Sequence, residues 1–486
     1  MSVSWSTPFN TSSSVVLYRE STLQPGGAGA RPGPGEPVES EETGEAVRYY
    51  ETFHHHVVLK NLKASTRYEY AVGDGVNYTS FDYSFVTAPD YGSFLKGEEE
   101  DEPVKFSIFG DLGLVNGGPT MEYLKSSSAS DLGLIFNLGD VGYADDSFLH
   151  YGCMVTFCYE EKFDEYMREM EGIISKVPMM TTPGNHEADC HDPACLVSSK
   201  RREKLSNFTA YNARFRMPSE ETGGVMNMWY SFNYGPVHFV ALDLETGFPG
   251  SAEERRYVLP CGGFGDQLKW LESDLKAANE QRHLRPWVIL GGHHPMYSKG
   301  KVDPKMSRSI EWMLQKYQVD FFVAGHEHSY ERNYPMYYGS PSPPRPTTAR
   351  RSNGGSDDGA SSSFSSSDST LDFRVAAASR QIYSQSKTNG TIHLLIGGPG
   401  NDEQDDSAGG STRALQLLKM YPNLDASKGS KDRWHDGLVD VGEDTVAFED
   451  LDNYGIGVFR ATRGEICMEY VRTRDGSVKD KVCVVK

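Results

Sequence analysis

Five short segments of the chain place metal-binding residue types directly after a glycine. They contain the sequences GDLG, GDVGY, GNHE, GHHP and GHEH, which begin at residues 110, 139, 184, 292 and 325. Each segment follows an apolar run, and each glycine allows the chain to turn sharply toward a shared point. One such turn is common, and the pair His326 and His328 alone is more often a strand edge than a metal site. Together, the five segments predict one common centre.

The candidate metal ligands in these segments are Asp111, Asp140, Tyr143, Asn185, His293, His326 and His328. Seven ligands exceed the number that a single tetrahedral ion takes. They suit two ions about 3.5–4 Å apart that share a carboxylate. Asp140 is the natural bridge, because a carboxylate offers two oxygen atoms.

The elements that must position these residues begin at Val104. From there, short continuous apolar runs alternate with helix-like stretches such as residues 265–281 and 307–318. Continuous apolar runs are typical of strands buried on both faces, so we expect a layered α/β fold. Ligands of open α/β sheets bind outside the carboxyl ends of the strands, which is where the five polar segments fall.

The chain before this region reads as short β-rich segments, which predict a small β-sandwich over residues 1–96. His54, His55 and His56 lie in one of these segments and are interpreted as strand residues. An acidic linker is predicted at 97–103, followed by one α/β domain over 104–486. Within that domain, the Ser-, Pro- and Gly-rich residues 338–372 predict a disordered insert.

Composition excludes several classes of protein. The formal net charge of −20 excludes a basic footprint for nucleic acid and a polybasic membrane patch. We find no apolar run near the roughly 18 residues of a membrane helix, and the first residues do not read as a signal peptide. Glycosylation sequons occur at Asn10, Asn77, Asn207 and Asn389 and are weak evidence for secretion.

Six of the seven cysteines fall into close pairs, which are Cys153 with Cys158, Cys190 with Cys195, and Cys467 with Cys483, while Cys261 is left over. This placement favours local disulfides in an oxidising compartment. A zinc site is the rival interpretation of the second pair, but two Cys and one His fall short of four ligands.

The five segments, in this order, resemble those of the purple acid phosphatases, two-metal phosphoesterases of the calcineurin-like superfamily. The resemblance covers most of residues 104–486, and the N-terminal region is similar to the fibronectin III-like domain of plant-type members. It implies an all-β sandwich followed by an α/β/β/α four-layer domain. It also implies Fe(III) at Asp111, Asp140, Tyr143 and His328, and a divalent zinc, manganese or iron ion at Asp140, Asn185, His293 and His326.

The activity that this resemblance implies is hydrolysis of phosphate monoesters by attack of metal-bound hydroxide. Phosphorylated small molecules or phosphoproteins would be the substrates. His186 would contact phosphate and protonate the leaving oxygen, with Glu187 orienting it, and Asn185 and His294 would line the substrate pocket. A phosphodiesterase or nucleotide pyrophosphatase on the same centre is the alternative. A non-catalytic surface-binding module is a second alternative, against which the intact ligand set argues.

Two departures from the family pattern stand out. Some plant members carry a histidine pair about ten residues after the histidine of GH-x-P, whereas residues 296–306 here contain no histidine. Lys299, Lys301 and Asp303 are the residues of that stretch that could substitute. We also expect the first strand of the fibronectin-like domain to be missing, and hence a truncated start of a secreted, lysosomal, vacuolar or cell-surface protein. The resemblance leaves an oligomer open.

Overall fold

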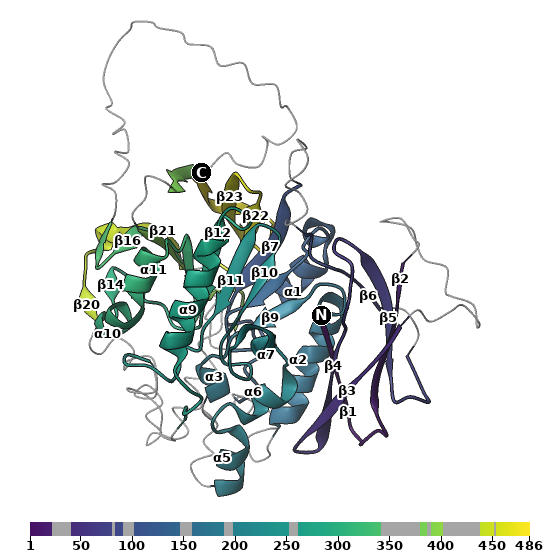
Figure 1. Cartoon of the computed structure of the whole chain (residues 1–486). Coiled ribbons are helices and arrows are strands. Elements are labelled where there is room, and N and C mark those ends of the chain that lie inside the picture. Colours follow the sequence, from purple (N-terminus) through teal and green to yellow (C-terminus); the bar gives the residue numbers. More distant parts are fainter. Residues whose placement is uncertain are drawn as a thin grey trace, which may run out of the picture.

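The structure is a computed structural model. It describes residues 1–21, 40–79, 83–90, 102–145, 158–188, 198–251, 261–341, 380–385, 390–401, 438–451 and 453–486. Three parts are visible in Figure 1: a β-rich N-terminal unit, two central sheets, and helices that cover them.

The N-terminal unit is one continuous six-stranded ribbon that folds into two halves. In sheet order its strands are β1 (Ser2–Thr7), β4 (Thr52–Val58), β3 (Ser40–Tyr49), β2 (Ser14–Glu20), β5 (Arg67–Gly73) and β6 (Tyr83–Val86). The first half of β3 pairs with β2 and its second half with β4. Buried side chains of both halves, among them Val3 and Tyr70, share one core. The expected β-sandwich is therefore confirmed.

Two further sheets carry the rest of the fold. One has the order β18 (Arg380–Ser384), β24 (Val478–Val485), β23 (Glu465–Arg472), β22 (Gly455–Ala461), β7 (Val104–Phe109), β8 (Ile135–Asn137) and β9 (Met179–Thr181). The other has the order β10 (Tyr230–Tyr234), β11 (Val237–Ala241), β12 (Trp287–Gly291), β15 (Phe321–Ala324), β19 (Thr391–Ile396), β16 (Tyr330–Tyr337) and β17 (Ser340–Pro341), with β21 (Val446–Asp450) also on β16. A small third sheet joins β13 (Tyr297–Ser298), β14 (Lys301–Val302) and β20 (Val439–Asp440).

The two large sheets pack face to face through aromatic side chains. The ring of Phe106 in β7 lies 5.1 Å from that of Phe239 in β11, centroid to centroid. Successive residues of β15 then alternate between two cores: Phe321 faces the opposite sheet, and Phe322 faces the helices. Because both faces of such a strand are buried, its sequence is continuously apolar, as expected.

Helices cover the outer faces of this sandwich (Figure 1). They are α1 (Gly118–Lys125), α2 (Tyr159–Ile174), α3 (Asn185–Ala188), α5 (Ser199–Leu205), α6 (Thr209–Arg214), α7 (Ser219–Thr222), α9 (Gln267–Glu280), α10 (Pro304–Met306), the π-helix η4 (Ser307–Glu311) and α11 (Trp312–Lys316), with 3-10 turns η2 (Ser127–Ala129) and η7 (Glu443–Thr445). Leu271 and Leu275 of α9 pack with Ile310 of η4 on the β11–β12–β15 face. The α/β class of the second domain is confirmed.

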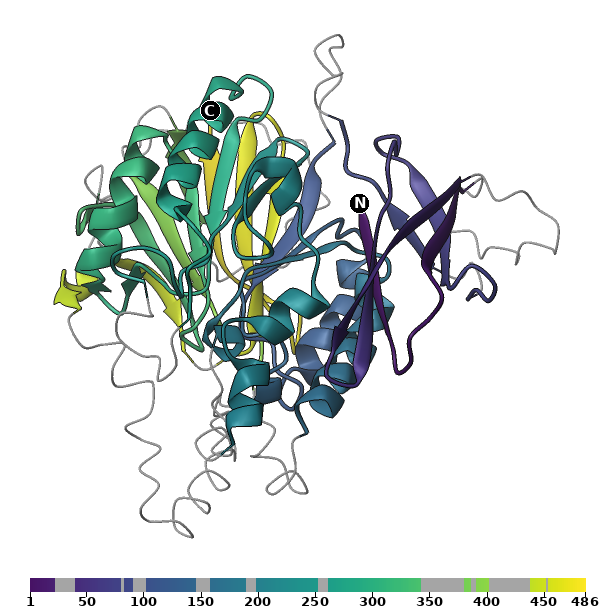
Figure 2. The same ribbon diagram turned by 60° about the horizontal axis from the view of Figure 1, so that its bottom comes forward.

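The N-terminal unit rests on the helices of the second domain (Figure 2). The hydroxyl of Tyr70 donates to the carbonyl of Ser175 after α2 at 2.9 Å. His56 Nε2 lies 3.0 Å from the carbonyl of Ala213 in α6. The three consecutive histidines bond to hydroxyls of β1 and β2, for example His55 Nδ1 to Ser14 at 2.8 Å. They are strand residues that secure the sandwich, as interpreted from the sequence.

Several predictions concern residues that the structure does not describe. Most of the predicted insert, residues 342–372, lies outside the described ranges, whereas residues 338–339 form a turn and residues 340–341 form β17. The linker at 97–103 stays a prediction, since residues 91–101 are also outside. Cys467 and Cys483 form the expected disulfide, and Cys158 is disulfide-bonded. Cys153, Cys190 and Cys195 are not among the described residues.

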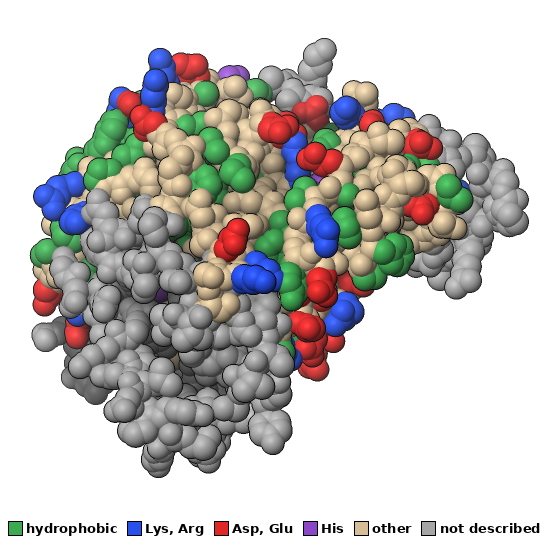
Figure 3. Space-filling model, turned by 90° about the horizontal axis from the view of Figure 1, so that it is seen from below, with side chains coloured by type: hydrophobic (Ala, Val, Ile, Leu, Met, Phe, Trp, Pro, Cys, Tyr) green, Lys and Arg blue, Asp and Glu red, His purple; other side chains and the backbone are tan. Residues whose placement is uncertain are grey.

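The charged surface and the length of the helices both bear on membrane binding. On the described surface of the face in Figure 3, Lys and Arg side chains lie among Asp and Glu side chains. On that part of the surface, side chains of both charges are interspersed. Within the described ranges, none of the helices combines the length and apolar character needed to cross a lipid bilayer.

A buried histidine beneath the helices predicts a loss of stability in acid. His393 in β19 is 2% exposed, and in the described part of the chain neither of its ring nitrogens has a hydrogen-bond partner. Burial lowers the pKa of His393 to about 3. The unfolded chain, with a pKa of about 6.5, binds this proton first, so stability falls as pH drops below 6.5.

We expect His393→Phe to remove this dependence. Relative to the variant, the unfolding free energy of the unmodified protein should fall by about 2–3 kcal/mol between pH 7 and 4.5, measured by urea unfolding. The same change at the exposed His283 is the matched control. A pH-dependent difference of equal size at His283 would contradict the assignment to burial.

Candidate metal centre

The seven predicted ligands all follow the carboxyl ends of strands in the two packed sheets. β7, β8 and β9 are parallel neighbours and lead to Asp111, Asp140 with Tyr143, and Asn185. β12 and β15 are parallel neighbours in the other sheet and lead to the three histidines. Because parallel strands end at the same edge, each sheet brings its own set together. Oxygen donors come from one sheet and imidazoles from the other.

The first group of ligand atoms surrounds Asn185. Its Oδ1 lies 2.9 Å from His293 Nε2 and 2.8 Å from His326 Nδ1. His293 Nε2 also lies 3.0 Å from Asp140 Oδ2. Ligand atoms of Asp140, His293 and His326 all lie within 4.8 Å of one another. His293 Nδ1 donates to the carbonyl of Leu138 at 2.8 Å, so Nε2 is the nitrogen that faces the group.

The second group surrounds the phenol oxygen of Tyr143. The hydroxyl donates to Asp111 Oδ1 at 3.0 Å and approaches Asp140 Oδ2 at 3.4 Å. It lies 3.1 Å from His328 Nε2. Asp140 contributes the same oxygen, Oδ2, to both groups, so it stands between them.

Four of these residues hold a backbone conformation that non-glycine residues rarely adopt. The φ angles are 64° at Asp111, 53° at Asp140, 51° at Tyr143 and 74° at His326. Such strain costs of order 1–3 kcal/mol each and clusters at functional sites. Here it turns each side chain back toward the centre immediately after its strand.

Glycines make the close approach of the loops possible. A Cβ on Gly325 would lie 2.4 Å from Asp111 Oδ2, and one on Gly184 would lie 2.3 Å from Asp140 Oδ1. Neither distance is compatible with an added carbon. The glycine before His326 thus leaves room for a carboxylate from the opposite sheet.

The pKa values of the buried groups at the centre favour a positive charge there. Burial, with added repulsion from Asp140, raises the pKa of Asp111 to about 8. Burial alone would lower the pKa of His293, but the carboxylates of Asp140 and Asp111 raise it to about 10. Conversely, burial would raise the pKa of Asp140, yet His293 and His186 hold it below its ordinary value.

The donor set therefore fits a pair of metal ions. Two buried carboxylates and a phenol supply hard oxygen donors beside three imidazoles and an amide oxygen. Cations at this position would stabilise the carboxylates in place of the proton on His293. The side chains that would hold them are already gathered.

His186 lies beside this centre and is oriented by a residue that the sequence did not suggest. Its Nδ1 donates to Asp145 at 2.9 Å, and its Nε2 lies 3.9 Å from Asp140 Oδ2. Glu187, expected to orient His186, instead accepts bonds from the backbone N–H groups of Asp140, Val141 and Gly184 at 2.7–2.8 Å. That expectation was wrong. Glu187 fixes the loop that carries Asp140.

His294 is placed behind the centre rather than in an open pocket. It is fully buried, its Nε2 lies 2.9 Å from Glu245 Oε2, and its ring centroid lies 4.0 Å from that of His326. This placement favours support of His326 over contact with substrate. Glu245 follows β11, which lies in the same sheet as β12 and β15. The end of β11 is thus a sixth strand end beside the five that the sequence indicated. Its segment, LDLETG, lacks the short glycine turn that marked the other five.

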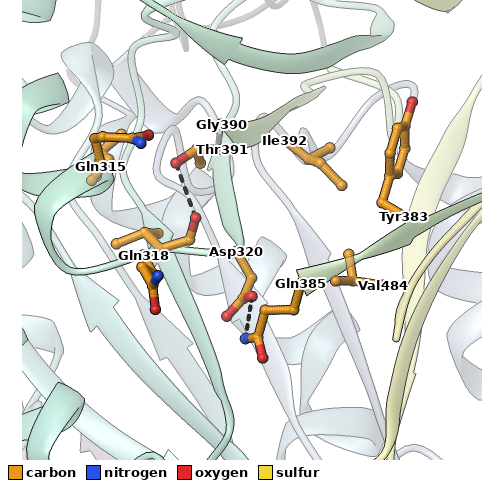
Figure 4. Close-up of a pocket in the computed structure, with 11 residues that line it drawn as sticks. Gln315, Gln318, Asp320, Tyr383, Gln385, Gly390, Thr391, Ile392 and Val484 are labelled. Carbon is orange, nitrogen blue, oxygen red and sulfur yellow. Dashed lines mark hydrogen bonds between the residues drawn. The ribbon is translucent and has the colours of Figure 1, made fainter. Parts of the chain in front are cut away.

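A small pocket shown in Figure 4 lies elsewhere, at the amino end of β15 and β19. Asp320 in its wall accepts bonds from Gln385 Nε2 and from Arg282 Nη1, both at 2.8 Å. Thr391 donates to the carbonyl of Val319 at 2.9 Å. These polar groups hold the strand starts in place, so the pocket is structural.

Family models match two parts of the chain. Residues 1–87 match the purple acid phosphatase N-terminal domain, and residues 104–330 match the calcineurin-like phosphoesterase domain. Among solved structures, a purple acid phosphatase from yellow lupin (Lupinus luteus) seeds is similar in fold. The TM-score is 0.62 at 18% identity, covering 100% of this chain and 72% of that one.

Curated relatives point in the same direction. An acid phosphatase of Aspergillus ficuum is 27% identical over 60% of this chain and 62% of its own length. Probable purple acid phosphatase 20 of Arabidopsis thaliana is 33% identical over 57% and 54%. Human acid phosphatase type 7 is 29% identical over 69% and 68%. The chain thus spans less than two thirds of the fungal and plant relatives.

Replacing the glycine before His326 should weaken metal binding at the centre. We expect Gly325→Ala to displace Asp111 and to lower bound metal from about two ions per chain to about one or fewer, measured by elemental analysis. Gly172→Ala in α2, where an added Cβ meets nothing within 4 Å, is the matched control. Unchanged metal content in a folded Gly325→Ala protein, checked by circular dichroism, would count against this placement.

Proposed function

We infer that the chain belongs to the purple acid phosphatase family of calcineurin-like phosphoesterases, and we propose that it is an acid phosphatase acting on phosphate monoesters. The observation that carries this proposal is the overlap of two ligand groups on Asp140 Oδ2. Membership implies a dinuclear metal centre. Phosphorylated small molecules or phosphoproteins are the proposed substrates.

We assign the two ions by the hardness of their donors. The group with Asp111, Tyr143 and His328 would hold Fe(III), because carboxylate and phenolate oxygens suit a hard trivalent ion. The group with Asn185, His293 and His326 would hold zinc, manganese or ferrous iron. Asp140 would bridge them. The Tyr143 position supports this choice, since its hydroxyl lies 3.0 Å from Asp111 and 3.1 Å from His328.

When bound, such ions lower the pKa of water and stabilise charge on the phosphoryl oxygens. The chain's own part in the reaction falls to His186. Because Asp145 accepts its Nδ1–H at 2.9 Å, its Nε2 faces the centre, where it can donate a proton to the leaving oxygen. Asp145 is therefore a positioning residue for the proposed acid.

An oxidising compartment is the proposed location, which covers secreted, lysosomal, vacuolar and cell-surface proteins. The Cys467–Cys483 disulfide supports it, because such bonds are rare in the cytosol. Asn77, an exposed sequon residue, is available for glycosylation.

A visible spectrum tests the metal assignment. The purified protein should show a broad purple band with about one iron and one divalent ion per chain. We expect Tyr143→Phe to lose the band while it keeps divalent metal, because the phenolate is its source. A colourless unmodified protein with two divalent ions would overturn the Fe(III) assignment and leave a general two-metal phosphoesterase.

Turnover tests the reaction class. At acid pH, the protein should hydrolyse an aryl phosphate monoester at least about tenfold faster than the corresponding diester. Asp145→Asn should lower kcat about 10–100-fold with little change in KM, since it disturbs the proton donor and not binding. Faster diester cleavage would favour the phosphodiesterase alternative, and absence of both activities in the metal-loaded protein would favour a binding module.

A further inference from the structure

An ion pair joins the turn between β13 and β14 to the loop that carries His326 and His328. Lys299 lies in this turn, and its Nζ lies 2.6 Å from Oε2 of Glu327. Glu327 stands between His326 and His328. The ammonium group of Lys299 therefore lies beside the segment that supplies a ligand to each of the two groups.

The Lys299 end of this ion pair is exposed to solvent. Within the fully described stretch 291–300, Lys299 is the one exposed residue, and its side chain is 46% accessible. Asp111, Asp140 and Tyr143 are at most 1% exposed. The segment 326–328, by contrast, is half-buried. The ion pair therefore joins an exposed ammonium group to a segment that carries two of the candidate ligands.

The backbone holds Lys299 in this position. Its φ of 52° is in the left-handed region, and its N–H donates to the buried carboxylate of Glu331 at 2.7 Å. Lys301 and Asp303, which lie close by in the sequence, have different roles. Lys301 lies on β14, which pairs with β20, and Asp303 caps α10 by accepting from the N–H of Lys305 at 2.9 Å. The positive φ angles of Lys299 and Gly300 are those of a two-residue hairpin turn between β13 and β14, and this turn fixes the position of Lys299.

The charge of Lys299 matters because of the negative charge around it. The protein carries −20, and Glu327 adds a carboxylate next to the centre. A phosphate group would be repelled by that carboxylate unless a cation neutralised it. Lys299 both neutralises Glu327 and offers further N–H donors, since an ammonium group has three.

We propose that Lys299 is a phosphate-binding residue: its ammonium group turns from Glu327 to a non-bridging oxygen of the substrate phosphate. The proposal rests on the proposed function and extends it to a contact supplied by this chain where some plant relatives are expected to use histidine. No covalent bond changes in this step. Glu327 holds the ammonium in place until the phosphate group arrives.

The first test replaces Lys299 by methionine, which keeps the length and removes the charge. For Lys299→Met, we expect the KM for a monoester and the dissociation constant for inorganic phosphate to rise about tenfold, with kcat within threefold and metal content unchanged. The matched control is Lys316→Met. Lys316 forms a similar surface pair with Glu272 at 2.8 Å, on α11 and α9, and its side chain is 52% exposed.

A double-mutant comparison separates direct contact from simple neutralisation. Glu327→Gln removes the repelling carboxylate, so it should tighten phosphate binding. If Lys299 contacts phosphate, Lys299→Met in the Glu327→Gln background should still weaken binding several-fold. Equal affinities of Glu327→Gln and the double variant would overturn the contact.

The binding assay also distinguishes the two proposals. Phosphate binding that is weakened by Lys299→Met, in a protein that hydrolyses no monoester, would support Lys299 and refute the acid phosphatase. Monoester hydrolysis with phosphate affinity unchanged in Lys299→Met would refute Lys299 alone. A protein that neither binds phosphate nor hydrolyses monoesters would refute both.

Discussion

Two buried carboxylates between two packed sheets are the constraint on which the rest of the site depends. Asp111 and Asp140 are almost completely removed from solvent, and like charges so placed demand a compensating cation. Isolated, such groups would be expensive to bury. The three imidazoles of the second sheet approach from the opposite side, and a metal pair suits the space between. The fold therefore brings buried carboxylates of one sheet against imidazoles of the other.

The same carboxylates hold the loops together. Asp111 Oδ2 accepts the N–H of His326 at 2.8 Å, a bond that ties the two sheets directly. Asp140 Oδ1 accepts the N–H of His186 at 2.9 Å, while Glu187 binds the N–H of Asp140. The strained residues His326 and Asp140 are thus each fixed by a side chain from another turn. This mutual support explains how several left-handed residues persist next to one another.

Behind this network, a further set of buried polar residues sets the direction of the histidines. Asp145 holds His186, the carbonyl of Leu138 holds His293, and Glu245 pairs with His294 beneath the ring of His326. Such outer partners fix the tautomer and the ring orientation of ligands. Lys299 and Glu327 form an ion pair next to this network. The proposed metal ligands and the proposed phosphate contact differ in depth: the carboxylates and their supports are buried, and Lys299 is exposed.

The sequence alone was sufficient for the architecture and for the set of candidate ligands. Continuous apolar runs indicate strands that are buried on both faces. A glycine followed by Asp, Asn or His at five strand ends is likewise a local pattern that can be read from the sequence. The Glu-rich sequence of β3 shows no apolar alternation and has Tyr49 as its one buried residue. Its sequence pattern therefore does not mark it as a strand. Local pattern cannot reveal partners that are distant along the chain.

Only the tertiary structure decided which residues support the centre and which one faces solvent. Asp145 reaches His186 across 41 positions, and Glu245 reaches His294 across 49. The sequence did not distinguish among Lys299, Lys301 and Asp303 as candidate substitutes for the missing histidines. In the structure, Lys299 pairs with Glu327, Lys301 lies on β14, and Asp303 caps α10. Burial and direction arise from packing of the two sheets, and that packing is a property of the whole chain.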